Sequence, residues 1–230
     1  MSKETSEHNQ ILCHGHEHGS SMTGELIEHF PYAVFSVALG LIGAALMQYF
    51  SFGASAYTVK NGSFILFHAF HYLHIVFAAT GSMITFFRFS KNIIKGVVVA
   101  TISTLFFCVL SDILLPYLAG YALGAHMNLH ICFNELNNVL PFLVIGLFNG
   151  WVLNQHSKDS QTYYSVWSHF AHIFVSSIAS LLYMISNGFD QWSQQMGPIF
   201  FMLILAVVIP CTFSDVVVPM FFAKRKKGHE

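Results

Sequence analysis

Charged residues are scarce in this sequence. Only 9% of its 230 residues are charged, whereas 54% are hydrophobic, and an ordinary soluble domain carries about 25% charged residues. A chain of this composition cannot keep most of its surface in water. The formal net charge of -1 also argues against nucleic acid as a partner, because bulk positive charge is absent.

Features of a secreted, disulfide-linked protein are also lacking. The chain has 4 cysteines, and two of them, Cys108 and Cys211, lie inside apolar runs, so a disulfide scaffold is not expected. The N-terminal segment is polar and rich in histidine. It has no basic start followed by an apolar run and a small-residue cleavage site, so we expect no cleaved signal peptide.

Long apolar segments are abundant. A bilayer core about 30 Å thick requires about 20 apolar residues in a helix. Six segments meet this requirement: 30-50, 64-88, 97-123, 136-155, 162-186 and 198-223. Only short links and two polar tails remain between and around them. The sequence therefore predicts an all-α integral membrane protein with six transmembrane helices and the lipid bilayer as its partner.

The positive charges predict an orientation. With six spans, one side of the membrane holds nine of the ten basic residues, and only Lys60 lies on the other side. Basic residues favour the cytoplasmic side. Both termini are therefore expected in the cytoplasm, with the protein in a plasma membrane or a bacterial inner membrane. Whether the chain forms a homo-oligomer stays open.

The two halves of the chain share three short motifs in the same order. They are Glu-Leu ahead of a proline (from Glu25 and Glu135), His-x-x-His-Ile (from His71 and His169) and Cys-x-x-Ser-Asp-x-x-x-Pro (from Cys108 and Cys211). The last motif takes two of the four cysteines and two of the four aspartates. Three helices per repeat reverse the direction of the chain, so we expect two inverted-topology three-helix repeats. Their predicted bounds are 25-123 and 124-223, between cytosolic tails at 1-24 and 224-230.

Two aspartates lie deep inside predicted spans, Asp112 and Asp215. An intramembrane carboxylate costs about 2.5–3.5 kcal/mol on insertion scales and usually faces the bundle interior for a functional reason. Pro116 and Pro219 follow four residues later and lack the N–H that would bond the aspartate's own carbonyl in an α-helix. A carboxylate beside a free carbonyl suits a cation. The alternative is a kink that serves packing alone.

Two histidine pairs complete a candidate metal centre. His71 and His74 share one helix face, and His169 and His172 repeat this spacing. With an aspartate from a neighbouring helix, each pair offers two nitrogens and one oxygen, a set that suits Zn²⁺, Fe²⁺, Mn²⁺, Co²⁺ or Ni²⁺. The alternative for each histidine is a hydrogen-bonded core residue.

Further candidate ligands surround these groups. Cys108 and Cys211 each precede an aspartate by four residues, and a thiolate would favour Zn²⁺ or copper; the alternative is a small buried hydrophobe. The remaining candidates are Glu25, Glu135, His126 and His130, although a glutamate at a helix start also favours the helix dipole. By depth, the histidine pair and aspartate of the first half of the chain fall in the outer half of the membrane. Those of the second half fall in its inner half. They would form two related sites or one elongated path.

The N-terminal tail carries a separate metal-binding type of tract. Cys13 is followed by His14, His16 and His18 at alternate positions. Such a short histidine-rich segment is typical of metal binding. We expect it to collect metal weakly and exchangeably on the cytosolic side.

These patterns favour a transporter or channel over an enzyme. The leading hypothesis is a secondary transporter or channel for a divalent transition-metal cation, with Zn²⁺ foremost and with proton coupling as an option. Three alternatives stay open: a membrane-embedded metal-dependent hydrolase, a b-type haem redox protein ligated by His74 and His172, and a proton-coupled carrier of an organic solute. The metal, the direction of transport and the coupling ion are not encoded in any recognisable pattern.

Overall fold

The computed structural model describes residues 22–130, 136–155 and 158–224, and within these ranges it contains helices and no β-strand. Five of its helical segments are long and apolar enough to cross a membrane, and a sixth apolar helix is shorter. The five are 30–50, 56–89, 93–122, 167–186 and 192–224, and the shorter one is 137–153. The described part of the chain is therefore all-helical, with helices that could span a membrane, as expected from its apolar segments.

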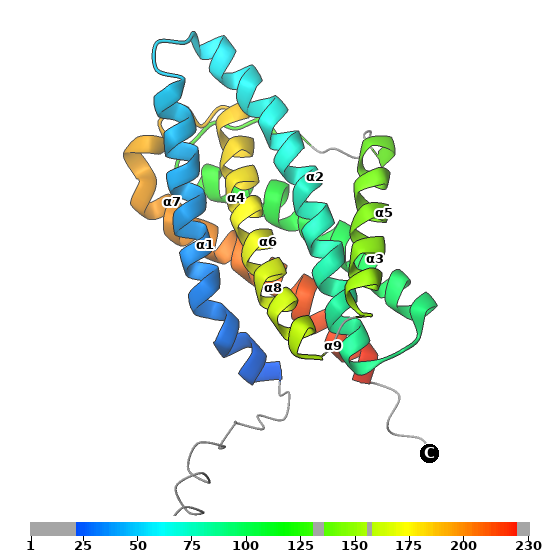
Figure 1. Cartoon of the computed structure of the whole chain (residues 1–230). Coiled ribbons are helices and arrows are strands. Elements are labelled where there is room, and N and C mark those ends of the chain that lie inside the picture. The colour runs from blue at the N-terminus through cyan, green and yellow to red at the C-terminus, as the bar shows by residue number, and fades with distance from the viewer. Residues whose placement is uncertain (1–21, 131–135, 156–157, 225–230) are drawn as a thin grey trace, which may run out of the picture.

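Two long helices form the centre of the bundle. Helix α2 (Ala56–Phe89) and helix α6 (Lys158–Ser186) pack side by side and run in opposite directions (Figure 1). Helix α1 (Met22–Phe50) covers α6, and helix α5 (Leu136–Leu153) covers α2. Each central helix is therefore shielded by a helix from the other half of the chain.

Glycines permit this close packing. A Cβ atom at Gly40 of α1 would lie 3.3 Å from the carbonyl oxygen of Phe174 in α6. One at Gly146 of α5 would lie 2.6 Å from the carbonyl oxygen of Val76 in α2. Small residues that let two backbones approach are a common device in membrane helix packing. The same device therefore joins α1 to α6 and α5 to α2.

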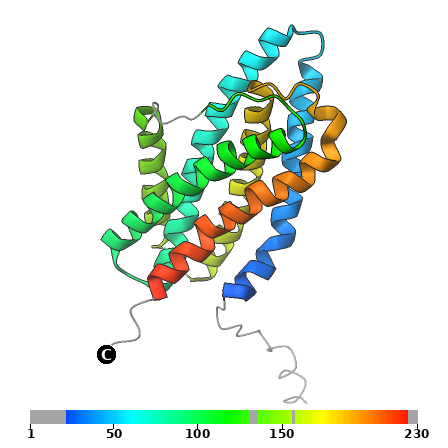
Figure 2. The same ribbon diagram turned by 180° about the vertical axis from the view of Figure 1, so that it is seen from behind.

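Two interrupted helical segments lie on the other face of this layer, which Figure 2 shows in front. The first comprises α3 (Ile93–Val109), the π-helical turn η1 (Leu110–Leu114) and α4 (Leu115–Ala122). The second follows a 3-10 turn, η3 (Trp192–Gln195). It comprises α7 (Met196–Leu203), π-helical η4 (Ile204–Val208), α8 (Ile209–Thr212), π-helical η5 (Phe213–Val217) and α9 (Val218–Lys224). The two segments contact each other along their lengths.

Helix starts are set by polar caps that lie ahead of the apolar runs. Ser55 Oγ accepts a hydrogen bond from the Thr58 amide at 3.1 Å, and Asn92 Oδ1 accepts one from the Lys95 amide at 3.0 Å. Helices α2 and α3 therefore begin before the spans predicted at 64-88 and 97-123. Hydropathy identifies the membrane-embedded part of a helix, whereas the cap determines where the helix begins.

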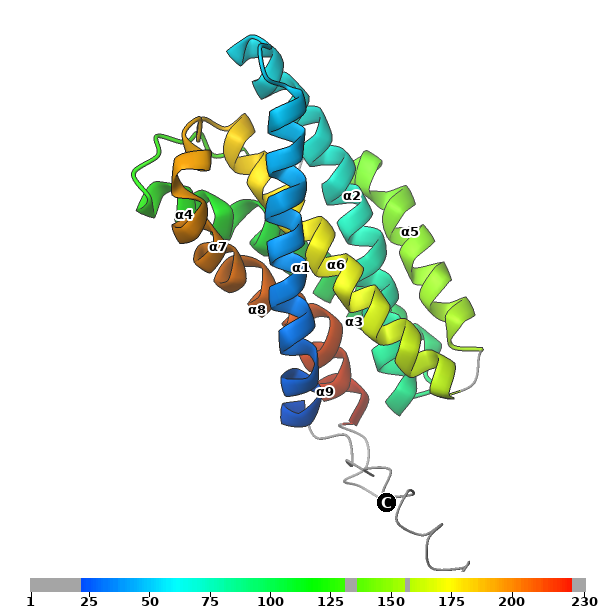
Figure 3. The same cartoon turned by 60° about the vertical axis from the view of Figure 1, so that its left-hand side comes forward.

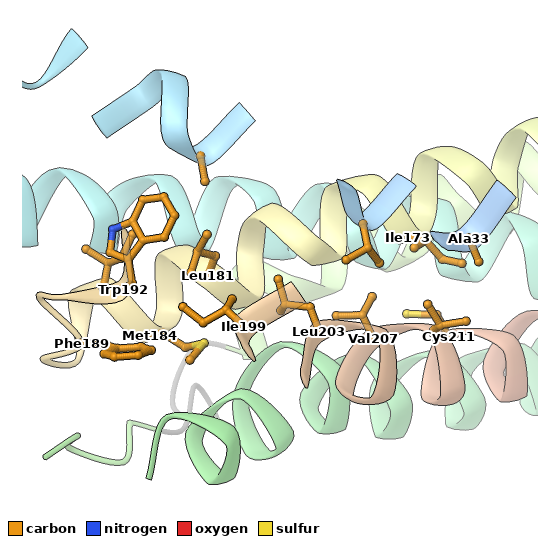
Figure 4. Packing of buried hydrophobic residues seen from close by; sticks show 14 residues of the cluster. Ala33, Ile173, Leu181, Met184, Phe189, Trp192, Ile199, Leu203, Val207 and Cys211 are labelled. Atoms are coloured by element: carbon orange, nitrogen blue, oxygen red, sulfur yellow. The ribbon is translucent and has the colours of Figure 1, made fainter. Parts of the chain in front are cut away.

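One of the apolar core clusters lies between α1, α6 and the α7–α8 segment. Figure 4 shows ten labelled members of this cluster, among them Trp192 and Ile199, which are 1% and 0% exposed. Large apolar side chains such as Phe35, Ile65 and Phe201 are exposed on the outside of the bundle, where a bilayer would solvate them.

Helix α1 begins and α9 ends at the same end of the bundle (Figures 1 and 3).

Candidate metal centre

The first histidine pair converges on the first aspartate. His71 and His74 project from α2 toward Asp112 in the π-helical turn η1. Their Nδ1 atoms lie 2.8 Å and 2.6 Å from the same oxygen, Oδ2 of Asp112. Because an ionised carboxylate only accepts hydrogen bonds, both Nδ1 atoms carry hydrogen and donate. The Nε2 atom of each ring is then left with its lone pair.

The second histidine pair repeats this arrangement from the other half of the chain. His169 and His172 project from α6 toward Asp215 in η5. Their Nδ1 atoms lie 3.3 Å and 2.5 Å from Oδ2 of Asp215. The structure therefore combines each predicted His-x-x-His pair with the aspartate of its own half, and it uses the same atoms in both.

The two groups meet in the middle of the bundle. His74 Nε2 contacts His172 Nε2, and the two ring centroids are 4.4 Å apart. A polar chain thus runs without interruption from Asp112 through both rings to Asp215. These four side chains are 0–2% exposed. Of the two predicted arrangements, separate sites or one elongated path, the geometry corresponds to one continuous cluster.

Both predicted cysteines face this cluster. Cys108 in α3 places its Sγ 3.6 Å from His74 Nε2, and Cys211 in α8 places its Sγ 3.7 Å from the same nitrogen. Both are free thiols and are 1% exposed. The sulfur atoms therefore lie where the two histidine pairs join, rather than toward lipid.

The π-helical turns place the aspartates and change which carbonyl the proline leaves unbonded. The amide of Leu115 bonds the carbonyl of Leu110, five residues back. In this register Pro116 faces the carbonyl of Ser111, not that of Asp112 as an α-helical register predicts. Ser180 Oγ in α6 donates to the Ser111 carbonyl at 3.0 Å. The carbonyl is thus satisfied by a side chain from the other half of the chain.

The second half has the matching arrangement. Pro219 faces the carbonyl of Ser214, which accepts hydrogen bonds from Ser82 Oγ at 2.7 Å and from Ser103 Oγ at 3.1 Å. Ser82 and Ser180 occupy corresponding positions, because each follows the second histidine of its own motif by eight residues. Each half therefore stabilises the proline-disrupted turn of the other.

The two halves differ at one oxygen. Asp112 Oδ1 accepts a hydrogen bond from Ser176 Oγ at 2.5 Å, and Ser111 Oγ lies 3.2 Å from it. Asp215 Oδ1 is buried and has no hydrogen-bond partner among the described residues. Ser176 lies four residues after His172, and the corresponding position after His74 is Ala78. The second carboxylate therefore keeps one acceptor oxygen that the first does not.

The remaining predicted ligands are not joined to this cluster. His126 is exposed. The backbone of His130 exchanges two hydrogen bonds of 3.0 Å with the Tyr183 hydroxyl, and its ring lies 6.3 Å from that of His68. Glu135, the side chain of Glu25 and the tail histidines His14, His16 and His18 lie outside the described residues.

Sequence reasoning did not select Ser176 or Gly81 as part of this centre. A Cβ atom at Gly81 would lie 2.7 Å from Oδ2 of Asp215, so the absence of a side chain lets the carboxylate approach α2. Ser176 and Gly81 each lie within two helical turns of a motif histidine. That spacing was the available signal, but serine and glycine are too common in membrane helices to stand out.

The fold and the centre define an all-helical membrane protein with a buried histidine, aspartate and cysteine cluster. Three sets of donor atoms lie close enough to hold a metal ion. They are His71, His74 and Asp112; His169, His172 and Asp215; and His74, His172 and Cys211. Comparisons of the chain with protein-family models, curated proteins and solved structures found no match.

Proposed function

We propose that this protein is a secondary transporter or channel for a divalent transition-metal cation. One observation carries the proposal: two equivalent His-His-Asp groups, buried in an apolar bundle, meet through His74 and His172. Imidazole and carboxylate are common ligands of such metals. A cluster that continues from one half of the chain into the other offers an ion successive positions along one path.

Charge supports a cation as the substrate. The ion pairs of Asp112 and Asp215 among the described residues are all with histidines. With neutral imidazoles and ionised carboxylates, the cluster carries two negative charges, which a divalent ion neutralises. Protons compete for the same histidines because a ligating imidazole must be deprotonated. Proton coupling by competition at this cluster is therefore part of the proposal.

The proposed architecture is six spans in two inverted repeats, 25-123 and 124-223. It is supported by the paired motifs, by the reciprocal packing of α1 on α6 and α5 on α2, and by the π-helical turn at each aspartate. Inverted repeats commonly place a site near the membrane midplane, where they rock against each other. Separation of His74 from His172 would open the cluster toward one side at a time.

The proposed orientation places both termini in the cytoplasm of a plasma membrane or bacterial inner membrane. Its support is the distribution of lysine and arginine, nine of ten on one side. The histidine-rich tail would then collect or receive metal on the cytosolic side. Homo-oligomerisation is not required, because both halves of the cluster come from one chain.

The geometry gives less support to the alternatives. A bis-histidine haem needs a slot for the porphyrin between its two ligands, whereas His74 and His172 touch. A hydrolase needs one site that admits its substrate, whereas this cluster is duplicated and 0–3% exposed. A carrier of an organic solute would use the histidines for protons alone, which leaves the two adjacent thiols without a role.

A flux assay tests this proposal. The full chain is reconstituted in proteoliposomes that contain a metal-sensitive dye, and Zn²⁺, Mn²⁺, Co²⁺ and Ni²⁺ are added outside. We expect uptake of at least one ion, and its loss in His74→Gln and His172→Gln. His126→Ala is the matched control, because His126 is exposed and outside the cluster. The proposal is wrong if no ion enters, or if the cluster variants transport as well as the control.

A further inference from the structure

We propose that the transported ion is bound at the junction of the two halves by imidazole Nε2 and cysteine sulfur, and that the substrate is therefore a thiophilic divalent ion, Zn²⁺, rather than Mn²⁺ or Mg²⁺. This inference rests on the proposed function and names the substrate class of the same cluster. The site comprises His74, His172 and Cys211, with Cys108 beside His74.

The aspartates determine which imidazole nitrogens are available. Asp112 and Asp215 each occupy Nδ1 atoms of two histidines through a single oxygen. The Nε2 atom is therefore the donor that His74 and His172 present to an ion. A carboxylate behind a metal-bound histidine is a common arrangement, because it fixes the ring and raises the basicity of the ligand.

The meeting of the two rings calls for a cation. With hydrogen on both Nδ1 atoms, His74 and His172 direct two Nε2 lone pairs at each other. Two lone pairs in contact repel unless a proton is shared between the nitrogens in a hydrogen bond or a metal ion is bound by both. A metal ion bound by both nitrogens removes this repulsion and offsets the charge of the two carboxylates behind the rings.

Sulfur lies at the distance that a shared ion requires. In a tetrahedral zinc site with Zn–N of about 2.0–2.1 Å and Zn–S of about 2.3 Å, nitrogen and sulfur are about 3.6 Å apart. Cys108 Sγ and Cys211 Sγ lie 3.6 Å and 3.7 Å from His74 Nε2. The donor atoms of His74, His172 and Cys211 lie within 4.8 Å of one another.

The donor types select the ion. Among divalent ions, Zn²⁺ is favoured by thiolate ligands, whereas Mg²⁺ and Mn²⁺ favour carboxylate, carbonyl and water. Among the described residues of the cluster, hydrogen bonds leave one carboxylate oxygen without a partner, Oδ1 of Asp215. Asp215 belongs to a different donor set from Cys211. With Cys108, whose Sγ lies 3.6 Å from His74 Nε2, as a second thiolate, the ligands would be two imidazole nitrogens and two sulfurs, one of the common structural zinc sets.

Cobalt spectroscopy tests the ligand set. The full chain carries Cys13→Ser and Cys132→Ser, so that only Cys108 and Cys211 remain, and is titrated with Co²⁺ under reducing conditions in detergent. We expect a thiolate-to-cobalt charge-transfer band in the near ultraviolet, which saturates at one ion per chain and is lost in Cys108→Ser/Cys211→Ser. Equimolar Zn²⁺ should abolish the band, and Mn²⁺ should not.

The outcomes separate this inference from the proposed function. Co²⁺ binding without a thiolate band, or a band that survives the double substitution, overturns the sulfur ligands and leaves transport through the histidines standing. Absence of any binding contradicts both. X-ray absorption of the zinc-loaded Cys13→Ser/Cys132→Ser chain, in which only Cys108 and Cys211 can supply sulfur, is a second test. A Zn–S shell at about 2.3 Å supports the inference, and a shell of nitrogen and oxygen alone, at about 2.0–2.2 Å, overturns it.

Discussion

Small residues around the cluster control how closely its carboxylates approach the neighbouring helices. Gly81→Ala would bring a Cβ atom to 2.7 Å from Oδ2 and 3.0 Å from Cγ of Asp215. We expect this substitution to lower the free energy of unfolding by about 1–3 kcal/mol through overpacking and to weaken metal binding. Gly62→Ala on the same helix is the control, because a Cβ there meets nothing within 4 Å. Equal stability of the two variants in detergent unfolding would contradict the packing described.

The difference between the two carboxylates gives a second test. Ser176→Ala removes a donor from buried Asp112 and should cost about 1–3 kcal/mol. Ala78 occupies the position in the first half that Ser176 occupies in the second. Ala78→Ser should therefore stabilise the protein by offering a hydroxyl to Asp215 Oδ1. Thermal unfolding of both variants checks this expectation. A neutral Ser176→Ala would show that the hydrogen bond to Asp112 contributes nothing measurable.

The sequence predicted the residue types of the cluster but not its contacts. Motif spacing identified the four histidines, two aspartates and two cysteines, because intramembrane ionisable residues are rare enough to stand out. The contact between His74 and His172 depends on how far α2 and α6 rotate about their axes, which no spacing encodes. The use of Nδ1 rather than Nε2 toward the aspartates likewise depends on three-dimensional packing.

At the scale of helices, the π-helical turns link the two halves. Ser180→Ala should cost about 0.6–1.7 kcal/mol, because the Ser111 carbonyl loses its donor. In a Pro116→Ala background the restored amide can bond that carbonyl, so the cost should fall toward zero. A double-mutant cycle in mixed micelles measures the coupling.

Ser177→Ala is the control for this cycle, since its hydroxyl bonds the Ile173 carbonyl of its own helix at 2.7 Å. Its cost should be the same in both backgrounds. Additivity of Ser180→Ala with Pro116→Ala would argue against the proline as the reason for the cross-helix bond.

Hydropathy predicted the helical segments well and their interruptions poorly. The expected spans at 30-50, 97-123 and 198-223 correspond to helical segments at 30–50, 93–122 and 192–224. The prolines indicated disturbed turns. The assumption of an α-helical register, however, assigned the unbonded carbonyls to Asp112 and Asp215, one residue after the serine carbonyls that the prolines face. A π-helical turn depends on packing between segments, and sequence periodicity over five residues cannot distinguish it from an α-helical one.

At the scale of the whole molecule, the proposed orientation predicts which loops face outward. In a chain with Cys13→Ser and Cys132→Ser, Lys60→Cys should react with a membrane-impermeant thiol reagent in intact cells. Lys91→Cys, exposed beyond the other end of α2, should react only after permeabilisation. The reverse labelling pattern would invert the topology and place the histidine-rich tail outside.

The metal content of the purified protein tests the central claim most directly. The chain carries His14→Ala, His16→Ala and His18→Ala, which removes the tail histidines, and is loaded with Zn²⁺, desalted and assayed by elemental analysis. We predict about one bound ion per chain, lost when His74 and His172 are both replaced by glutamine. An ion content at background, or one that the double substitution leaves unchanged, would contradict a metal centre at the junction of α2 and α6.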